Sequence, residues 1–182
     1  YFIKGETFDE IISQNRKLTG EAPMYPRWAL GYMQSRNRYR SESELMGVVK
    51  KQRALKIPMD VIILDYYHWG NQGFGSFVFD EEDFPNPEKM IETLHKKYNC
   101  KLLVSAWPSF TPETKNWKLF ENNGYLLDVM AAFNSQVYDA YNLEAGKLYY
   151  ELLKKAYLGK GVNGWWFDAT EPEDWTDLIK SK

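Results

Sequence analysis

Val61-Ile-Ile-Leu-Asp65 is the stretch of sequence that decides the fold class. Four apolar residues in a row, with no polar alternation, are typical of a strand buried on both faces, as strands in parallel sheets are. Three further runs have a similar character, namely Trp28–Gln34, Lys101–Trp107 and Val162–Asp168. More than about a dozen residues separate each run from the next, so the connections are crossovers and the strands are predicted to be parallel.

Helical signals fill the gaps between these runs. Ser41-Glu-Ser-Glu44 is a capping box, and Asn86-Pro87 offers a cap followed by proline in the first turn. We therefore expect helices at roughly residues 7–18, after the capping box, after Asn86, around Trp117 and Phe120 up to Asn123-Gly124, and from the cap at Asn142 to before Gly159.

Strands that alternate with helices fit two architectures, a doubly wound parallel sheet or part of a (β/α)8 barrel. A complete barrel needs about 250 residues, whereas this chain has 182. The residues therefore predict an α/β fold of about four parallel strands with crossover helices and leave the choice between the two architectures open. The chain begins at Tyr1 and stops at Lys182 without a structural signal, so we expect both ends to be cut from something longer.

Composition excludes several classes of function. Twenty-three Lys and Arg residues against 25 Asp and Glu leave a net charge of −2, so nucleic acid is not an expected partner. No apolar run approaches the roughly 18 residues of a membrane span, and the first residues do not form a signal peptide. One cysteine, Cys100, excludes an internal disulfide and a cysteine-based zinc site. Aromatic residues make up 16% of the chain; most of these rings should lie in the core, but a carbohydrate site would also use them.

The candidate site lies where the strands end, because parallel sheets with helical crossovers carry their active sites at the carboxyl edge. Asp65, Trp107 and Asp168 each close a predicted strand, and Glu171 follows three residues after Asp168. Trp166 shares a face with Asp168, because side chains alternate along a strand. Carboxylates beside aromatic rings suit sugars, and glycoside hydrolysis uses a carboxylate pair. Each aspartate taken singly could equally be a helix cap.

Other combinations of residues are weaker. His68 beside Asp65 and Asp168 would suit a metal-dependent hydrolase, but no second histidine or cysteine has ligand spacing, so no metal is expected. Gly70, Gly73 and Gly75 lack the strand-turn-helix context of a phosphate-binding loop.

The chain resembles glycoside hydrolase family 31, the family of retaining α-glucosidases and α-xylosidases. The resemblance rests first on Trp165-Trp-Phe-Asp-Ala-Thr-Glu-Pro172, which is similar to the nucleophile motif of that family. Four further matches occur in the order of the family: Ala22-Pro23 with Pro26–Gly31, Ile57–Asp65, Phe84–Glu88 and Val104–Pro108. Together they cover essentially the whole chain.

The resemblance implies a fold and a set of roles. The family has a (β/α)8 catalytic barrel after a β-sandwich domain and needs neither a metal nor another cofactor. Residues 1–22 would be a connector and N-terminal helix, and residues 23–182 the first half of the barrel. The implied catalytic residues are Asp168 as nucleophile and Glu171 as its support. The implied substrate-binding residues are Asp65, Tyr67, Trp107 and Trp166.

The resemblance also implies a substrate. The nucleophile motif and Tyr138–Asn142 lean toward α-xylosidases, with α-glucosidase or a non-catalytic sugar-binding domain as alternatives, so the expected partner is an α-glycoside or oligosaccharide. The acid/base of the family lies beyond Lys182, and the isolated chain is therefore expected to be inactive. Exposed edges at the first and fourth strands would allow self-association. The compartment stays open, with a bacterial periplasmic or secreted location favoured.

Overall fold

The computed structural model describes residues 2–170, and these fall into two compact units that meet between Leu30 and Gly31. The first unit holds helix α1 (Phe8–Thr19) and the short 3-10 helix η1 (Arg27–Leu30). Thr7 begins α1, because its hydroxyl accepts a hydrogen bond from the backbone N–H of Glu10 at 3.2 Å. The predicted helix over residues 7–18 is confirmed.

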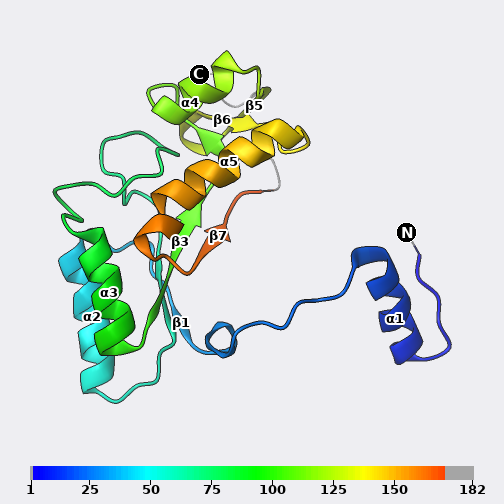
Figure 1. The fold of residues 1–182 in the computed structure, drawn as a ribbon, viewed down its shortest axis with the longest axis horizontal. Coiled ribbons are helices and arrows are strands. Elements are labelled where there is room, and N and C mark those ends of the chain that lie inside the picture. Colours follow the sequence, from blue (N-terminus) through cyan, green and yellow to red (C-terminus); the bar gives the residue numbers. More distant parts are fainter. Residues whose placement is uncertain (1, 171–182) are drawn as a thin grey trace. The chain divides into compact units, whose positions relative to one another are not determined.

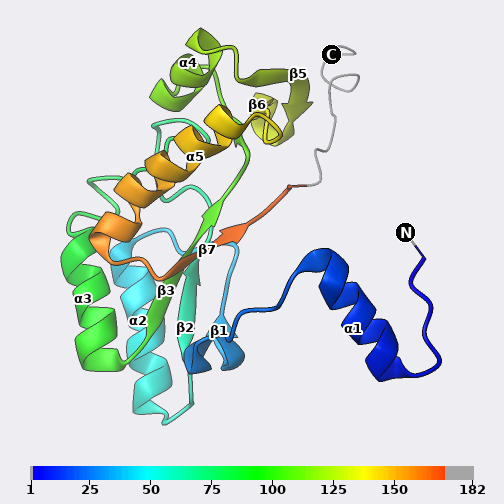
Figure 2. The ribbon, with the colours of Figure 1, turned by 45° about the vertical axis from the view of Figure 1, so that its right-hand side comes forward.

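Four parallel strands form the sheet of the second unit (Figures 1 and 2). They are β1 (Met33–Gln34), β2 (Val61–Leu64), β3 (Lys101–Ala106) and β7 (Gly164–Phe167), in the order β1-β2-β3-β7. Leu64 pairs with Val104, and Ser105 pairs with Trp166. The parallel pairing and four parallel strands are confirmed. The first strand is shorter than the predicted run Trp28–Gln34: its beginning lies in the 3-10 helix η1, and only Met33–Gln34 pairs with β2.

Three helices cover one face of this sheet. They are α2 (Glu42–Ala54), α3 (Pro87–Tyr98) and α5 (Leu143–Ala156), and they begin where the sequence predicts. The Ser41 hydroxyl accepts from the N–H of Glu44, and the Asn142 side chain accepts from the N–H groups of Glu144 and Ala145. Asn86 stands at the start of α3 but makes no capping hydrogen bond with its side chain, so proline at the first position defines that start.

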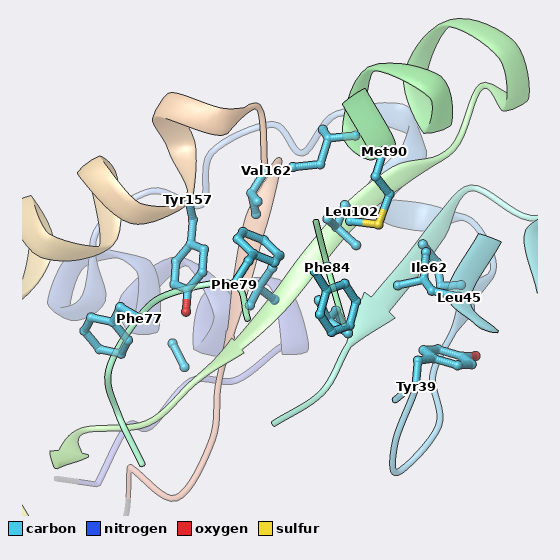
Figure 3. Close-up of a cluster of buried hydrophobic side chains, with 14 of the residues drawn as sticks. Tyr39, Leu45, Ile62, Phe77, Phe79, Phe84, Met90, Leu102, Tyr157 and Val162 are labelled. Atoms are coloured by element: carbon cyan, nitrogen blue, oxygen red, sulfur yellow. The ribbon is translucent and has the colours of Figure 1, made fainter. Parts of the chain in front are cut away.

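The hydrophobic core lies between this sheet and the three helices (Figure 3). Along β2 and β3, Ile62, Leu64, Leu102 and Val104 point into it and are completely buried. Ile63 and Leu103 lie between them and point to the other face, where they are only partly buried. Because side chains alternate along a strand, one face of the sheet is covered by helices and the other stays partly open.

A second sheet, which the sequence did not predict, follows β3. It has the antiparallel order β4-β6-β5, from β4 (Ser109–Phe110), β5 (Leu126–Ala131) and β6 (Ser135–Tyr138). Helix α4 (Lys115–Asn122), which was predicted, lies between β4 and β5, and the 3-10 turn η2 (Ala132–Asn134) joins β5 to β6. The rings of Tyr138 on β6 and Tyr149 on α5 stack with centroids 4.6 Å apart, which fixes this small sheet against the core.

Candidate active site

Asp65 follows directly after β2 and is 6% exposed. Its Oδ1 accepts a hydrogen bond from the backbone N–H of Tyr66 at 2.8 Å. Burial raises the pKa of the Asp65 carboxyl; the Tyr66 N–H opposes this rise, the charge of Asp168 adds to it, and the neighbouring Ser105 hydroxyl opposes it. Asp65 and Asp168 are therefore close enough to interact electrostatically.

Asp168 follows directly after β7 and is partly buried. Its backbone N–H donates to the carbonyl of Ala106 at 3.1 Å, so the pairing of β7 with β3 continues as far as this residue. Its Oδ1 accepts from the N–H of Ala169 at 2.9 Å, as the Oδ1 of Asp65 does from Tyr66. One strand, β3, separates β2 from β7, so the two carboxylates start from strand axes about 10 Å apart.

The strand register brings the remaining predicted residues to the same edge. Ser105 is level with Trp166, and Trp107, one residue beyond the paired Ala106, is level with Asp168. Trp166 shares the face of Asp168 and is 39% exposed. Within residues 2–170, the Trp107 indole N–H is buried and has no hydrogen-bond partner. The open face of the sheet thus ends in a row of polar and indole side chains.

Aromatic rings form a wall beside these carboxylates. The ring of Trp107 lies 5.1 Å from Phe74, 6.4 Å from Phe133 and 6.5 Å from Tyr66, measured between centroids. Tyr66 in turn lies 4.9 Å from Tyr67. We call these five residues the aromatic wall. Sequence reasoning named Tyr67 and Trp107 but missed Phe133, because only the unpredicted β5–β6 connection carries it to this place.

Tyr67 lies at the rim of the site. The guanidinium of Arg38 is 4.9 Å from the centre of its ring. Both residues line a hollow of about 350 Å³ whose other walls include Asp80, Glu82 and Asp83. A larger hollow of about 560 Å³ lies away from the strand ends, between the 76–88 segment and α5, where no predicted site residue reaches.

His68 does not face the carboxylates as a metal ligand would. It is 1% exposed, its Nδ1 lies 3.2 Å from the carbonyl of Asp65, and its Nε2 lies 2.8 Å from the hydroxyl of Tyr157. Both ring nitrogens are therefore engaged. Within residues 2–170, no three histidine, cysteine, aspartate or glutamate side chains are placed to hold a metal ion. The alternative of a metal site at Asp65, His68 and Asp168 is not supported by this geometry.

The structure thus gathers five of the six predicted site residues, Asp65, Tyr67, Trp107, Trp166 and Asp168, at or beside the carboxyl edge of one parallel sheet. Glu171 lies outside the described residues. No helix in the described part of the chain has both the length and the apolar character needed to cross a membrane.

Fold and site together define a piece of an α/β barrel whose candidate site combines two carboxylates with aromatic rings. A family model described as the glycosyl hydrolases family 31 TIM-barrel domain matches residues 22–181. The chain therefore belongs to glycosyl hydrolase family 31, and its parallel sheet is part of the barrel of that family.

Similar proteins include α-xylosidases. The chain is 42% identical to an α-xylosidase of Saccharolobus solfataricus over 98% of its own length and 24% of that protein. A family 31 α-xylosidase from a soil metagenome, solved with xylose, has a TM-score of 0.86 at 36% identity, covering 93% of this chain and 26% of that one. The α-xylosidase of Xanthomonas citri has a TM-score of 0.85 at 34% identity, with 93% and 19% covered. The chain spans about a quarter of the length of the first of these relatives.

Proposed function

We propose that this chain is the nucleophile-bearing part of a retaining α-glycoside hydrolase that acts on α-xylosides. The observation that carries the proposal is the placement of Asp65 and Asp168 at one edge of the sheet, where their charges interact beside the Trp107 ring. Membership of family 31 supports it independently. In this proposal Asp168 is the nucleophile, Glu171 supports it, and the sugar contacts Asp65, Tyr67, Trp107 and Trp166.

The reaction has two steps. A carboxylate oxygen of Asp168 attacks the anomeric carbon, a carbon–oxygen bond forms, and the glycosidic carbon–oxygen bond breaks. The leaving oxygen takes its proton from an acid that the family resemblance places beyond Lys182. Water then attacks the glycosyl-enzyme, gives its proton back to that group and frees Asp168. Asp65 accepts hydrogen bonds from sugar hydroxyls throughout.

Xylosides are favoured over glucosides because the relatives named above are α-xylosidases. An α-glucosidase remains the alternative, since α-glucosidases are also among the similar proteins, for example α-glucosidase 2 of Bacillus thermoamyloliquefaciens at 31% identity over 94% of this chain. The two substrates differ by one hydroxymethyl group, so the choice between them depends on whether the pocket has room for that group and a partner for its hydroxyl.

The test uses the protein in the length at which it is encoded. Hydrolysis of nitrophenyl α-xyloside should exceed that of the α-glucoside, and Asp168→Asn should abolish both. A 5-fluoro-α-xylosyl fluoride should leave a sugar covalently attached to the peptide that contains Asp168, detectable by mass spectrometry. Asp128→Asn, which changes an exposed aspartate on β5, is the matched control and should leave the rate unchanged. A label on another residue, or full activity in Asp168→Asn, would refute the assignment.

The 182-residue chain by itself is proposed to be inactive. General acid catalysis contributes about 10²–10⁴-fold, and the family resemblance places the proton donor beyond Lys182. Purified chain should release no xylose. Release that Asp168→Asn abolishes would show that the chain contains a complete site.

Self-association is proposed through the two edge strands. Within the described residues, β1 and β7 each pair with a strand on one side only, and such edges can pair with another chain. Light scattering on the 182-residue chain should therefore detect dimers or larger species, whereas a uniform monomer with a cooperative melting transition would contradict this. The division into a connector over residues 1–22 and the first half of the catalytic domain over residues 23–182 stays a prediction.

A further inference from the structure

Phe133 reaches the candidate site from outside the parallel sheet. It lies in η2, the connection between β5 and β6, and is 45% exposed. Its ring is stacked on Phe74, with an interplanar angle of 26° and centroids 5.0 Å apart. It also lies 5.8 Å from Tyr67, 5.9 Å from Tyr66 and 6.4 Å from Trp107. The small antiparallel sheet therefore contributes a ring to the aromatic wall.

The backbone at this position is unusual for a phenylalanine. Phe133 has φ of +61°, in the left-handed region that favours glycine or asparagine. Residues held in such conformations are strained and cluster at ligand-binding sites. Packing alone does not explain a large apolar side chain that is nearly half exposed and stands on a strained backbone. One flat side of the ring rests on Phe74, so the exposed part of the ring is held in a fixed orientation.

The rings of the aromatic wall come from different parts of the fold. Tyr66 follows Asp65 directly, and Trp107 follows the last residue of β3, so both start from the strand ends. Phe133 comes instead from the β5–β6 connection and lies beside these two rings. A sugar that reacts at Asp168 would lie against the rings that start from the strand ends, and the unit attached to it would extend toward Phe133.

We propose that Phe133 is a specificity-determining residue that stacks on the leaving-group sugar of an oligosaccharide substrate. The inference rests on the proposed function, which it deepens by naming an oligosaccharide, rather than a glycoside of a small alcohol, as the preferred substrate. The C–H-rich face of a pyranose packs on a flat aromatic ring, while its hydroxyls remain free for polar neighbours. Phe133 takes no part in the bond-breaking steps.

The experiment compares two substrates of the complete protein as it is encoded. One is a disaccharide with an α-linked xylose at its non-reducing end, and the other is α-xylosyl fluoride, whose leaving group is too small to reach Phe133. Phe133→Leu keeps an apolar side chain but removes the flat ring. It should raise KM for the disaccharide about threefold to tenfold, the range expected for one aromatic contact, and leave kcat/KM for the fluoride unchanged. Phe133→Tyr should restore the disaccharide value.

Tyr150→Leu is the matched control, because Tyr150 is 48% exposed but lies on α5, on the helix-covered side of the sheet. It should leave both substrates unaffected. Equal losses on the two substrates in Phe133→Leu, or no loss on either, would overturn the inference and assign Phe133 to packing. If the protein binds the disaccharide without cleaving it, Phe133→Leu should raise the dissociation constant, measured by titration calorimetry, by the same factor as expected for KM. In that case the hydrolase proposal fails, while the stacking of Phe133 on the second sugar unit stands. A protein that neither binds nor cleaves the disaccharide refutes both.

Discussion

The imidazole of His68 should make the domain less stable in mild acid. Burial lowers the pKa of His68 from 6.5 to about 4 in the folded protein, so the neutral ring persists there well below neutral pH. Burial also raises the pKa of Tyr157 far above its usual value, so its hydroxyl is a proton donor. Tyr157 therefore donates to Nε2 of His68, and Nδ1–H donates to the carbonyl of Asp65. The ring links α5 to the strand end that carries Asp65.

The direction and size of this effect on the free energy of unfolding follow from the pKa of His68 in the folded and in the unfolded protein. Between pH 6.5 and about 4 the unfolded chain binds a proton on His68 that the folded protein excludes, so stability falls as the pH falls. Each pH unit between the two values corresponds to about 1.4 kcal/mol. Lowering the pH from 7.5 to 4.5 should therefore cost about 2.5 kcal/mol through His68 alone. The raised pKa of Asp65 acts in the opposite direction and is common to all variants compared below.

Urea unfolding followed by tryptophan fluorescence at pH 4.5, 5.5, 6.5 and 7.5 measures this effect. His68→Asn cannot titrate, so its free energy of unfolding should depend less on pH than that of the unmodified protein. The gap between the two proteins should change by about 2.5 kcal/mol across the series. Tyr157→Phe keeps the imidazole buried, so it should lose about 1–3 kcal/mol at pH 7.5 and keep most of the acid dependence. A gap between the unmodified protein and His68→Asn that stays constant from pH 7.5 to 4.5 would refute the reasoning.

Three further predictions concern the core and the helices. Leu102→Ala should lower the free energy of unfolding by about 2–5 kcal/mol, because Leu102 is completely buried between sheet and helices; a urea midpoint close to that of the unmodified protein would show that the site collapses or is not packed. Asn142→Ala should cost about 1 kcal/mol, since two N–H groups of α5 lose their acceptor, whereas Asn142→Asp should cost little, and equal losses in both would argue against capping. Burial raises the pKa of the Cys100 thiol to about 11, so Ellman's reagent should label the folded protein only slowly and the urea-unfolded chain at once; rapid labelling without urea would place the thiol at the surface.

Much of the fold could be predicted because its signals are local. The apolar run before Asp65 and the caps at Ser41 and Asn142 need only a few neighbouring residues to act, and the structure confirms them. Asn86 shows the limit of such signals: proline follows it at the start of α3, but its side chain makes no capping hydrogen bond. Residue type predicted the boundary correctly, while the hydrogen bond depends on the backbone angles of the preceding loop.

The small antiparallel sheet could not be predicted for the opposite reason. β4 has two residues, and its partner β6 begins 25 residues after β4 ends, so neither shows a periodic pattern of its own. Beyond its backbone pairing, the sheet is held by the Ser135 hydroxyl, which donates to Ser109, and by Tyr138, which stacks on Tyr149. These contacts exist only after the chain has folded, and Phe133 depends on them for its position.

The candidate site has some features that local sequence predicts and others that only the folded sheet determines. Asp65 and Asp168 were predictable, since each closes an apolar strand and the rule about strand ends applies to it directly. The sheet order and register place β3 between the strands of Asp65 and Asp168 and bring Ser105 level with Trp166. Strand spacing along the sequence does not contain that information.

Asp65 and Asp168 each turn an oxygen back onto the amide of the very next residue. Two consecutive residues thus set part of the orientation of each acid group, whereas the distance between the two groups depends on the sheet that holds their strands. Because only the backbone N–H of residues 66 and 169 is used, the side chains at these two positions can change to any residue other than proline without loss of the hydrogen bonds.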